Sequence, residues 1–315
     1  MTQHSTRTSA PGAVHGSTPS GARIAAAPIS WGVCEVPDWG YQLDAATVLD
    51  QMRGLGLAAT EFGPEGFLET EPAARAEQLA SYGLRAVGGF LPVLLHDPDH
   101  DPLPEVDRFI DGCVACGAGV VVLAAYTGVD GYDARPDLDA VGWATLLGNL
   151  DRISDHARSR GVVAALHPHV GTMVESGEET ERVLSGSRVG LCVDTGHLLV
   201  GGGDPVAITA AHPERVEHVH LKDVDAAVAE RYGAGGLTLM GATQEGLFQP
   251  LGRGDARIAE VLAQLEAHGY ERWLVLEQDA ALTGEEPPVG SGPVLDVQAS
   301  IEFVRERAPG RGRGA

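Results

Sequence analysis

The feature that most constrains the fold of this chain is an eightfold alternation of short apolar runs and longer amphipathic stretches. The apolar runs have the length of strands, and several amphipathic stretches are followed by a glycine, which commonly ends a helix. Eight alternating units predict a parallel sheet covered by helices, an α/β fold in the form of a single (β/α)8 TIM barrel. The predicted strands span residues 24–31, 58–62, 85–91, 120–125, 162–167, 189–194, 216–221 and 273–277. The predicted helices span about residues 44–55, 71–82, 104–116, 138–160, 178–184, 205–212, 256–268 and 296–307.

A doubly wound open sheet is the alternative arrangement of alternating strands and helices. Such sheets usually carry a GxGxxG motif after the first strand. The corresponding segment of this chain is Ile29-Ser30-Trp31-Gly32-Val33-Cys34, which does not match that motif. The barrel is therefore favoured, and we expect it to span residues 23–307.

Both ends of the chain have the composition of segments without regular structure. Residues 1–22 are rich in Ser, Thr, Gly, Pro and Ala and contain no apolar run, so we expect a disordered leader and not a signal peptide. Residues 308–315 are mostly Gly, Arg and Ala, so we expect a flexible tail. No stretch reaches the roughly 18 apolar residues of a membrane-spanning helix. We expect a cytoplasmic protein.

The formal net charge of −22 limits the partners that the chain can bind. Nucleic acids and anionic membranes both require basic protein surface, so we expect neither as a partner. The four cysteines do not indicate a secreted disulfide scaffold, because a chain of 315 residues does not need such cross-links to fold.

Potential metal ligands follow the last four predicted strands. In a (β/α)8 barrel the carboxyl ends of the strands meet at one face, where catalytic residues are found. Two carboxylates held close together repel unless a cation binds between them, and mixed oxygen and nitrogen donors suit a divalent transition metal better than Mg²⁺ or Ca²⁺. We therefore expect a divalent metal ion, with Mn²⁺ or Co²⁺ as the first candidates. Its predicted ligands are His167, Asp194, His220 and Glu277.

Four further polar residues are candidate catalytic groups. His169 shares a strand face with His167 but lies farther out, so it is a candidate ligand, general base or substrate clamp. Lys222, at the mouth of the barrel, either steadies an enolate oxygen or moves a proton, or is a surface lysine. His197 either acts on the substrate, orients the neighbouring aspartate, or caps a loop. Glu61, at the end of the second strand, binds substrate hydroxyls or acts as a base.

Several other residues admit two interpretations. His218 lies one layer below the predicted ligand of the seventh strand, and we interpret it as a hydrogen-bonded interior histidine. Trp31 and Trp39 flank the loop after the first strand, where they stack on a sugar or cyclitol ring or belong to the core. Residues 252–255 open the seventh helix, where many barrels bind phosphate. Asp255 would repel an anion there, so we expect it to cap the helix.

Motifs at the strand ends resemble those of the xylose-isomerase-like barrels, the family of sugar phosphate isomerases and epimerases. Within that family the chain is most similar to the inosose dehydratase branch, whose loop before the seventh helix resembles residues 246–254. The resemblance covers about residues 24–305. The motifs are Pro28-Ile29-Ser30-Trp31, His167-Pro168-His169, Asp194-Thr195-Gly196-His197, His218-Val219-His220-Leu221-Lys222-Asp223 and Glu277-Gln278-Asp279.

The resemblance implies a set of metal ligands that this chain matches with one change. Members of the family usually have Glu, Asp, His and Glu at the ends of strands five to eight. The last three positions correspond to Asp194, His220 and Glu277, whereas His167 stands in place of the first glutamate. A histidine-rich end of strand five is also a feature of the inosose dehydratase branch, so it favours dehydration over epimerisation.

The implied activity is that of a metal-dependent lyase acting on a 2-keto-cyclitol, 2-keto-myo-inositol, in inositol catabolism. A base, His169 or Lys222, removes the α-proton of the ketone, and a protonated group, Glu61 or His197, helps the β-hydroxyl leave as water. One alternative is a sugar or keto-sugar isomerase or epimerase with the same metal site, and another is a non-catalytic sugar-binding protein. We expect a small polyhydroxylated ketone as substrate, and members of the family often form homo-oligomers.

Overall fold

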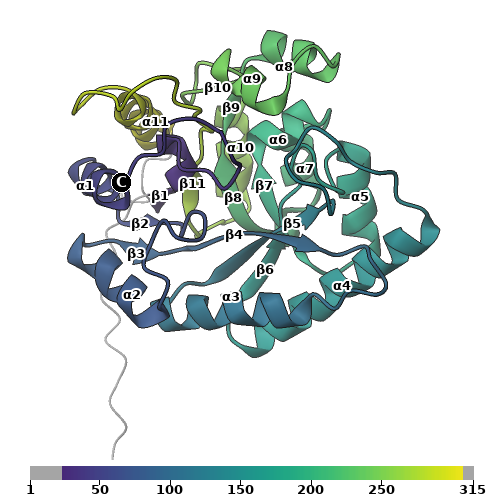
Figure 1. The fold of residues 1–315 in the computed structure, drawn as a ribbon. Helices are drawn as coiled ribbons and strands as arrows, with labels where there is room; N and C mark the ends of the chain where they lie inside the picture. Colours follow the sequence, from purple (N-terminus) through teal and green to yellow (C-terminus); the bar gives the residue numbers. More distant parts are fainter. Residues whose placement is uncertain (1–22, 308–315) are drawn as a thin grey trace, which may run out of the picture.

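The computed structural model describes residues 23–307, in which a parallel sheet closes into a barrel surrounded by helices (Figure 1). This confirms the predicted TIM barrel. The leader predicted over residues 1–22 and the tail predicted over residues 308–315 lie outside the described residues. In spatial order the strands of the described barrel are β3 (Arg85–Ala86), β2 (Ala59–Thr60), β1 (Ile24–Ala26), β11 (Leu274–Leu276), β8 (Val216–Leu221), β7 (Gly190–Asp194), β6 (Val163–Leu166), β5 (Val120–Tyr126) and β4 (Gly88–Leu94).

The third predicted strand, over residues 85–91, is divided at Val87 into β3 and β4. β3 pairs with β2 and β4 pairs with β5, so one continuous stretch of chain joins the two ends of the sheet. Val87 makes the connection: its N–H donates to the Thr60 carbonyl at 2.9 Å, and its carbonyl accepts from Gly119 N–H at 3.0 Å. The division therefore closes the barrel.

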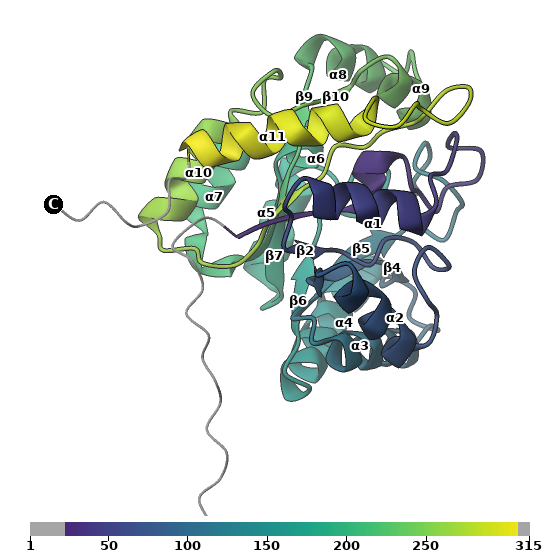
Figure 2. The same cartoon turned by 90° about the vertical axis from the view of Figure 1, so that its left-hand side faces the viewer.

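The helices around the barrel lie close to their predicted positions. Side chains cap several N-termini: Asp44 accepts from Thr47 N–H at 2.8 Å, and Ser176 forms a capping box with Glu179. The last helix, α11, lies beside α1 on the outside of the barrel (Figures 1 and 2). Within residues 23–307 no helix is long and apolar enough to cross a membrane. The outer helices are α1 (Ala45–Gly54), α2 (Pro72–Ser81), α3 (Leu103–Cys116), α4 (Ala140–Ser159), α5 (Gly177–Gly186), α7 (Pro205–Ala211), α10 (Ile258–Ala267) and α11 (Pro293–Arg307).

The first strand and the long loop after the seventh strand also differ from the prediction. β1 ends at Ala26, and Pro28–Trp31 form a 3₁₀ turn, because Pro28 has no N–H with which to continue a strand ladder. The loop predicted over residues 223–254 contains two short helices and two strands that pair antiparallel. These elements gather at one end of the barrel (Figure 1). They are β9 (Asp223–Val224), α8 (Ala226–Gly233), α9 (Leu239–Gln244) and β10 (Phe248–Gln249).

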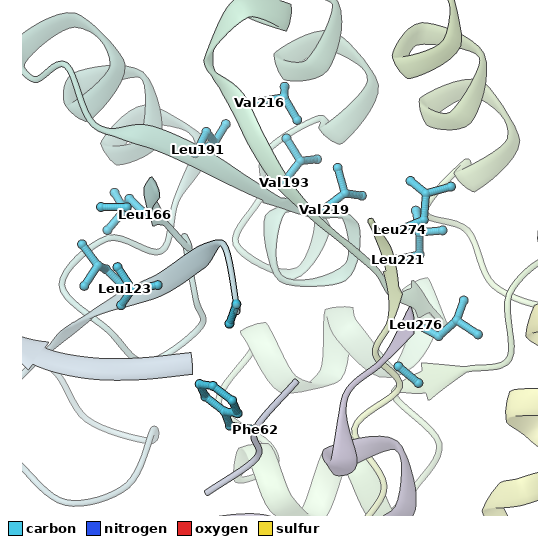
Figure 3. Close-up of a cluster of buried hydrophobic side chains, with 14 of the residues drawn as sticks. Phe62, Leu123, Leu166, Leu191, Val193, Val216, Val219, Leu221, Leu274 and Leu276 are labelled. Carbon is cyan, nitrogen blue, oxygen red and sulfur yellow. The ribbon is translucent and has the colours of Figure 1, made fainter. Parts of the chain in front are cut away.

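The strand side chains alternate between a barrel interior of small residues and an outer layer of larger ones. Leu166, Val193 and Leu221 belong to the outer layer, which packs beneath the helices (Figure 3). The interior contains small residues such as Ala165 and Val275. Because successive residues alternate, the residue that follows each of Leu166, Val193 and Leu221 points into the barrel. These three inward residues are His167, Asp194 and Lys222.

Replacing Gly88 with alanine should strongly destabilise the fold, because this residue begins β4 with a φ of +153°. A Cβ atom there would lie 1.9 Å from the carbonyl oxygen of Val120, so the backbone would have to move. We expect a loss of about 3 kcal/mol or more in the free energy of unfolding, measured by urea denaturation. Gly54→Ala is the matched control, because a Cβ atom at Gly54 meets no atom within 4 Å. Equal stability of the two variants would contradict this account of the strand division.

Candidate active site

The four side chains predicted as metal ligands meet inside the barrel at the carboxyl ends of β6, β7, β8 and β11. His167 Nε2 lies 3.3 Å from Asp194 Oδ2, and His220 Nδ1 lies 3.6 Å from the same oxygen. Asp194 of β7 is the pairing partner of His220 of β8, which brings these two side chains close together. His220 Nδ1 also lies 2.7 Å from Glu277 Oε2, but the geometry of this contact is not that of a hydrogen bond. The structure therefore brings all four residues together.

Several donor atoms of this cluster are buried without hydrogen bonds. Asp194 precedes α6 (Thr195–Val200), a helix that was not predicted, and its Oδ1 accepts from two N–H groups of the first turn. Among the described residues, Asp194 Oδ2, His220 Nδ1 and both ring nitrogens of His167 have no hydrogen-bond partner. One ligand atom from each of these three residues lies within 4.8 Å of the others. Because buried polar atoms rarely stay unpaired, this donor set fits a bound cation.

Lys222 is a fully buried lysine whose ammonium group contacts carboxylates from two strand ends. Its Nζ lies 2.7 Å from Asp279 Oδ1, 3.0 Å from Glu277 Oε1 and 3.4 Å from Asp194 Oδ2. Burial disfavours the ammonium, but these carboxylates outweigh burial and raise the pKa of Lys222 above its usual range. Lys222 is therefore a fixed positive charge, which suits it to stabilising an anion and not to accepting a proton.

His169 is a buried histidine with one free ring nitrogen. Its Nδ1 lies 2.7 Å from the carbonyl oxygen of Val170, and because a carbonyl only accepts, Nδ1 carries the proton and Nε2 keeps its lone pair. The ring packs against those of His197 and Tyr132, with centroids 3.7 and 4.5 Å away. Burial, together with nearby positive charge, holds the pKa of His169 well below its usual range. A neutral imidazole of this kind can accept a proton on Nε2.

His197 is a hydrogen-bond partner of Lys222 inside the barrel. Its side chain is fully buried, and its Nε2 lies 2.9 Å from Lys222 Nζ. An ammonium group only donates, so this ring nitrogen accepts the hydrogen bond. Burial, together with the positive charge of Lys222, holds the pKa of His197 well below its usual range. His197 therefore orients Lys222 and has no proton on the nitrogen that faces it.

Glu61, which follows β2, is held by two histidines of β8. Its Oε1 accepts from His218 Nε2 at 2.7 Å and from His220 Nε2 at 3.0 Å. Burial opposes ionisation, but His220 and His218 outweigh burial and hold the pKa of Glu61 below its usual range. His218 is therefore the hydrogen-bonded interior histidine that we expected, and Glu61 is an ionised carboxylate with no proton to give a leaving group.

Asp279 was not predicted as a site residue, yet it contacts Lys222. Burial raises the pKa of Asp279, Lys222 lowers it and Glu277 raises it further, which brings it to about 7. The sequence contained a signal for this position, because Asp279 follows Glu277 by two residues and so shares its face in an extended segment.

A cavity of about 640 Å³ adjoins the cluster, a size typical of small-molecule sites. Trp39 lines it and donates its indole N–H to the carbonyl of Ala280 at 2.9 Å. Trp31 is instead fully buried in the core and donates to Gln51. Of the two tryptophans considered for stacking on a ring, Trp39 is the one that reaches the cavity. The site residues that line the cavity are Glu61, His169, Glu277 and Asp279.

Residues 252–255, which we considered for phosphate binding, already hold an anionic group of the chain itself, the carboxylate of Asp223. Its Oδ2 accepts from the N–H groups of Gly252 and Gly254 at 2.7 and 3.0 Å. Its Oδ1 accepts from Ala256 N–H at 3.0 Å. Backbone N–H groups that would bind a phosphate are therefore occupied.

The capping role expected for Asp255 is wrong. Its carboxylate accepts from Ala226 N–H at 3.0 Å, which ties it to the start of α8. α10 begins after Arg257, which makes no side-chain capping hydrogen bond and has a left-handed φ of 55°. Because the backbone turns at Arg257, Asp255 lies too early in the chain to reach the first N–H groups of the helix.

The chain belongs to the xylose isomerase-like TIM barrel family, since a family model of that description matches residues 49–307. This is the enzyme family that the strand-end motifs indicated. A relative described as rhizopine catabolism protein MocC, from Rhizobium meliloti, is 35% identical over 82% of this chain and 81% of its own. An inosose dehydratase from Bacillus velezensis is 30% identical over 81% of this chain and 89% of its own. Another inosose dehydratase, from Geobacillus kaustophilus, is 29% identical over 90% of this chain and 93% of its own.

Solved structures share the fold at lower sequence identity. An L-ribulose 3-epimerase aligns with a TM-score of 0.65 at 14% identity, covering 90% of this chain and 93% of the epimerase. The IOLI protein, solved with a bound zinc atom, aligns with a TM-score of 0.65 at 15% identity, covering 91% of this chain and 99% of IOLI. At these identities the likeness concerns the fold.

Lys222→Met should destabilise the metal-free protein by about 3–5 kcal/mol, because it leaves buried carboxylates without their cation. Urea denaturation in the presence of a chelator measures this change. Adding Glu277→Gln should recover part of the loss, since it removes one uncompensated charge. If Lys222→Met were as stable as the wild type, the ammonium group would not be needed to balance this cluster.

Proposed function

We propose that the protein is a metal-dependent dehydratase, a lyase that removes water from a 2-keto-cyclitol such as 2-keto-myo-inositol in inositol catabolism. The observation that carries this proposal is the buried cluster of imidazole and carboxylate donors beside a cavity of about 640 Å³. Relatives described as inosose dehydratases, which align over most of both chains, support the choice of substrate.

A divalent metal ion is the cofactor that this donor set suits. Such an ion acts as a Lewis acid that polarises a ketone and acidifies the neighbouring C–H group. Mixed nitrogen and oxygen donors favour Mn²⁺ or Co²⁺ over Mg²⁺ and Ca²⁺. Zn²⁺ belongs in the same comparison, because the IOLI protein was solved with zinc. The residues that would hold the ion are His167, Asp194, His220 and Glu277.

The residues beside the cavity carry the proton transfers. His169 takes the α-proton on Nε2, the ring nitrogen that its backbone hydrogen bond leaves free. Lys222 stabilises the negative charge that develops on the ketone oxygen, since its ammonium group is fixed between Glu277 and Asp279. The β-hydroxyl takes a proton and leaves as water, and the enol product becomes a dione. Asp279 is the carboxyl group for that proton, because Glu61 is bound to two histidines.

The loop before α10 favours a substrate without a phosphate group. The N–H groups of Gly252 and Gly254 donate to Asp223, whose side chain is 1% exposed. A substrate phosphate would have to displace this buried carboxylate and would be repelled by it. A neutral polyhydroxylated ketone meets no such obstacle.

Removing the metal should abolish turnover, because the ketone would lose its Lewis acid. We expect dialysis against EDTA to inactivate the protein and Mn²⁺ or Co²⁺ to restore it. His167→Ala should lose both bound metal, measured by elemental analysis, and turnover. His268→Ala is the control, since this histidine is exposed and bonds only within its own helix. Full metal content and activity in His167→Ala would refute the ligand assignment.

The reaction type is tested with 2-keto-myo-inositol in D₂O, followed by NMR and mass spectrometry. A dehydratase gives a product lighter by one water, whereas an isomerase or epimerase exchanges the α-proton and keeps every hydroxyl group. We expect loss of water. His169→Asn should lower kcat by about 10²–10⁴-fold without changing the metal content, because it removes the base. Proton exchange without loss of water would favour the isomerase or epimerase alternative.

A further inference from the structure

Glu61, His218 and His220 form a hydrogen-bonded group inside the barrel. Their side chains are between 0% and 3% exposed, so water does not compete for these hydrogen bonds. Glu61 follows β2 and both histidines belong to β8, and β1 and β11 lie between these strands in the sheet. The contact therefore crosses the barrel interior and does not arise from neighbouring strands.

The hydrogen bonds determine which nitrogen of His220 carries a proton. A carboxylate oxygen only accepts, so Nε2 of each histidine donates to Glu61 Oε1. The other nitrogen of His220, Nδ1, then faces Asp194 Oδ2 and Glu277 Oε2, at 3.6 and 2.7 Å. Turning the ring over would break the bond to Glu61 and move Nδ1 away from the cluster.

We propose that Glu61 is a positioning residue that holds the His220 ring with Nδ1 toward the metal, and that His218 holds Glu61 in place. This role deepens the proposed function and rests on the metal assignment. It replaces the acid or base role predicted for Glu61 from the sequence. Carboxylates that accept from the outer nitrogen of a ligating histidine fix its tautomer and orientation, and losing one costs about 10–100-fold in metal affinity.

His218 is needed to fix Glu61, because a carboxylate held by a single hydrogen bond can still rotate about its Cγ–Cδ bond. With His218 and His220 both donating to Oε1, the oxygen has one position that satisfies both rings, whose centroids lie 5.0 Å apart. The arrangement also explains why His218, which no step of the proposed reaction uses, is a polar side chain deep in the barrel.

Two conservative variants separate the position of the Glu61 oxygen from its charge. Glu61→Gln keeps an oxygen at the same distance along the side chain but removes the charge. Glu61→Asp keeps the charge but withdraws the oxygen by one methylene group. Glu69→Gln is the matched control, because it makes the same change at an exposed residue of the same loop.

The readouts are the Zn²⁺ affinity of the metal-free protein, by competition with a chromophoric chelator, and the ¹⁵N signals of His220 in the Zn²⁺-loaded protein. We expect Glu61→Asp to weaken Zn²⁺ binding by about 10–100-fold and to lose the Nε2–H signal of the wild type. Glu61→Gln should keep that signal and bind Zn²⁺ more tightly than Glu61→Asp. Glu69→Gln should match the wild type.

The reverse order of the two Glu61 variants, or wild-type affinity and signals in Glu61→Asp, would overturn the positioning role. Circular dichroism and thermal unfolding check that each variant is folded, so a loss of affinity is not a loss of structure. Neither readout uses substrate. A wild-type protein that binds Zn²⁺ as described but does not dehydrate 2-keto-myo-inositol would therefore refute the proposed reaction and leave this inference standing.

Discussion

The ionic contacts of Lys222 are the interaction on which the site depends. Asp194, Glu277 and Asp279 approach one another inside the barrel, and burial alone would drive such carboxylates to take up protons. The ammonium group among them supplies positive charge at the same depth. Asp194 also caps α6, and Glu277 also reaches His220, so one buried cation connects the ends of β7, β8 and β11. This charge offsets the repulsion among the carboxylates of the candidate metal centre.

The barrel and the donor cluster were predictable because both follow from the alternation of side chains along strands. His167 and Asp194 each follow an outward-facing apolar residue, so their inward direction could be inferred from the sequence. The division at Val87 could not be inferred, since it depends on hydrogen bonds to Thr60 and to Gly119. The helix after Asp194 was missed for a related reason: its cap is a residue that also looked like the end of a strand.

The roles of the site residues were harder to predict than their positions. Glu61 was a candidate acid or base, but its partners stand 157 and 159 residues away in the sequence and reach it across the barrel. Lys222 was equally well interpreted as a surface residue. It is buried in part because the ring of Phe248, from the segment predicted as a loop, lies 5.0 Å from its Nζ. Such contacts between distant segments decide which groups keep a proton, and local sequence patterns do not encode them.

The divided third strand leaves only short strand pairing on one side of the barrel. β2 and β3 have two residues each, whereas β4 and β5 pair over seven. Few backbone hydrogen bonds hold this seam, so opening it locally should cost less free energy than opening the long β4–β5 pair. Amide hydrogens along the seam should therefore exchange with solvent before those of β4 and β5. Glu61 follows directly after β2, so this short-paired seam borders the residue that holds His220.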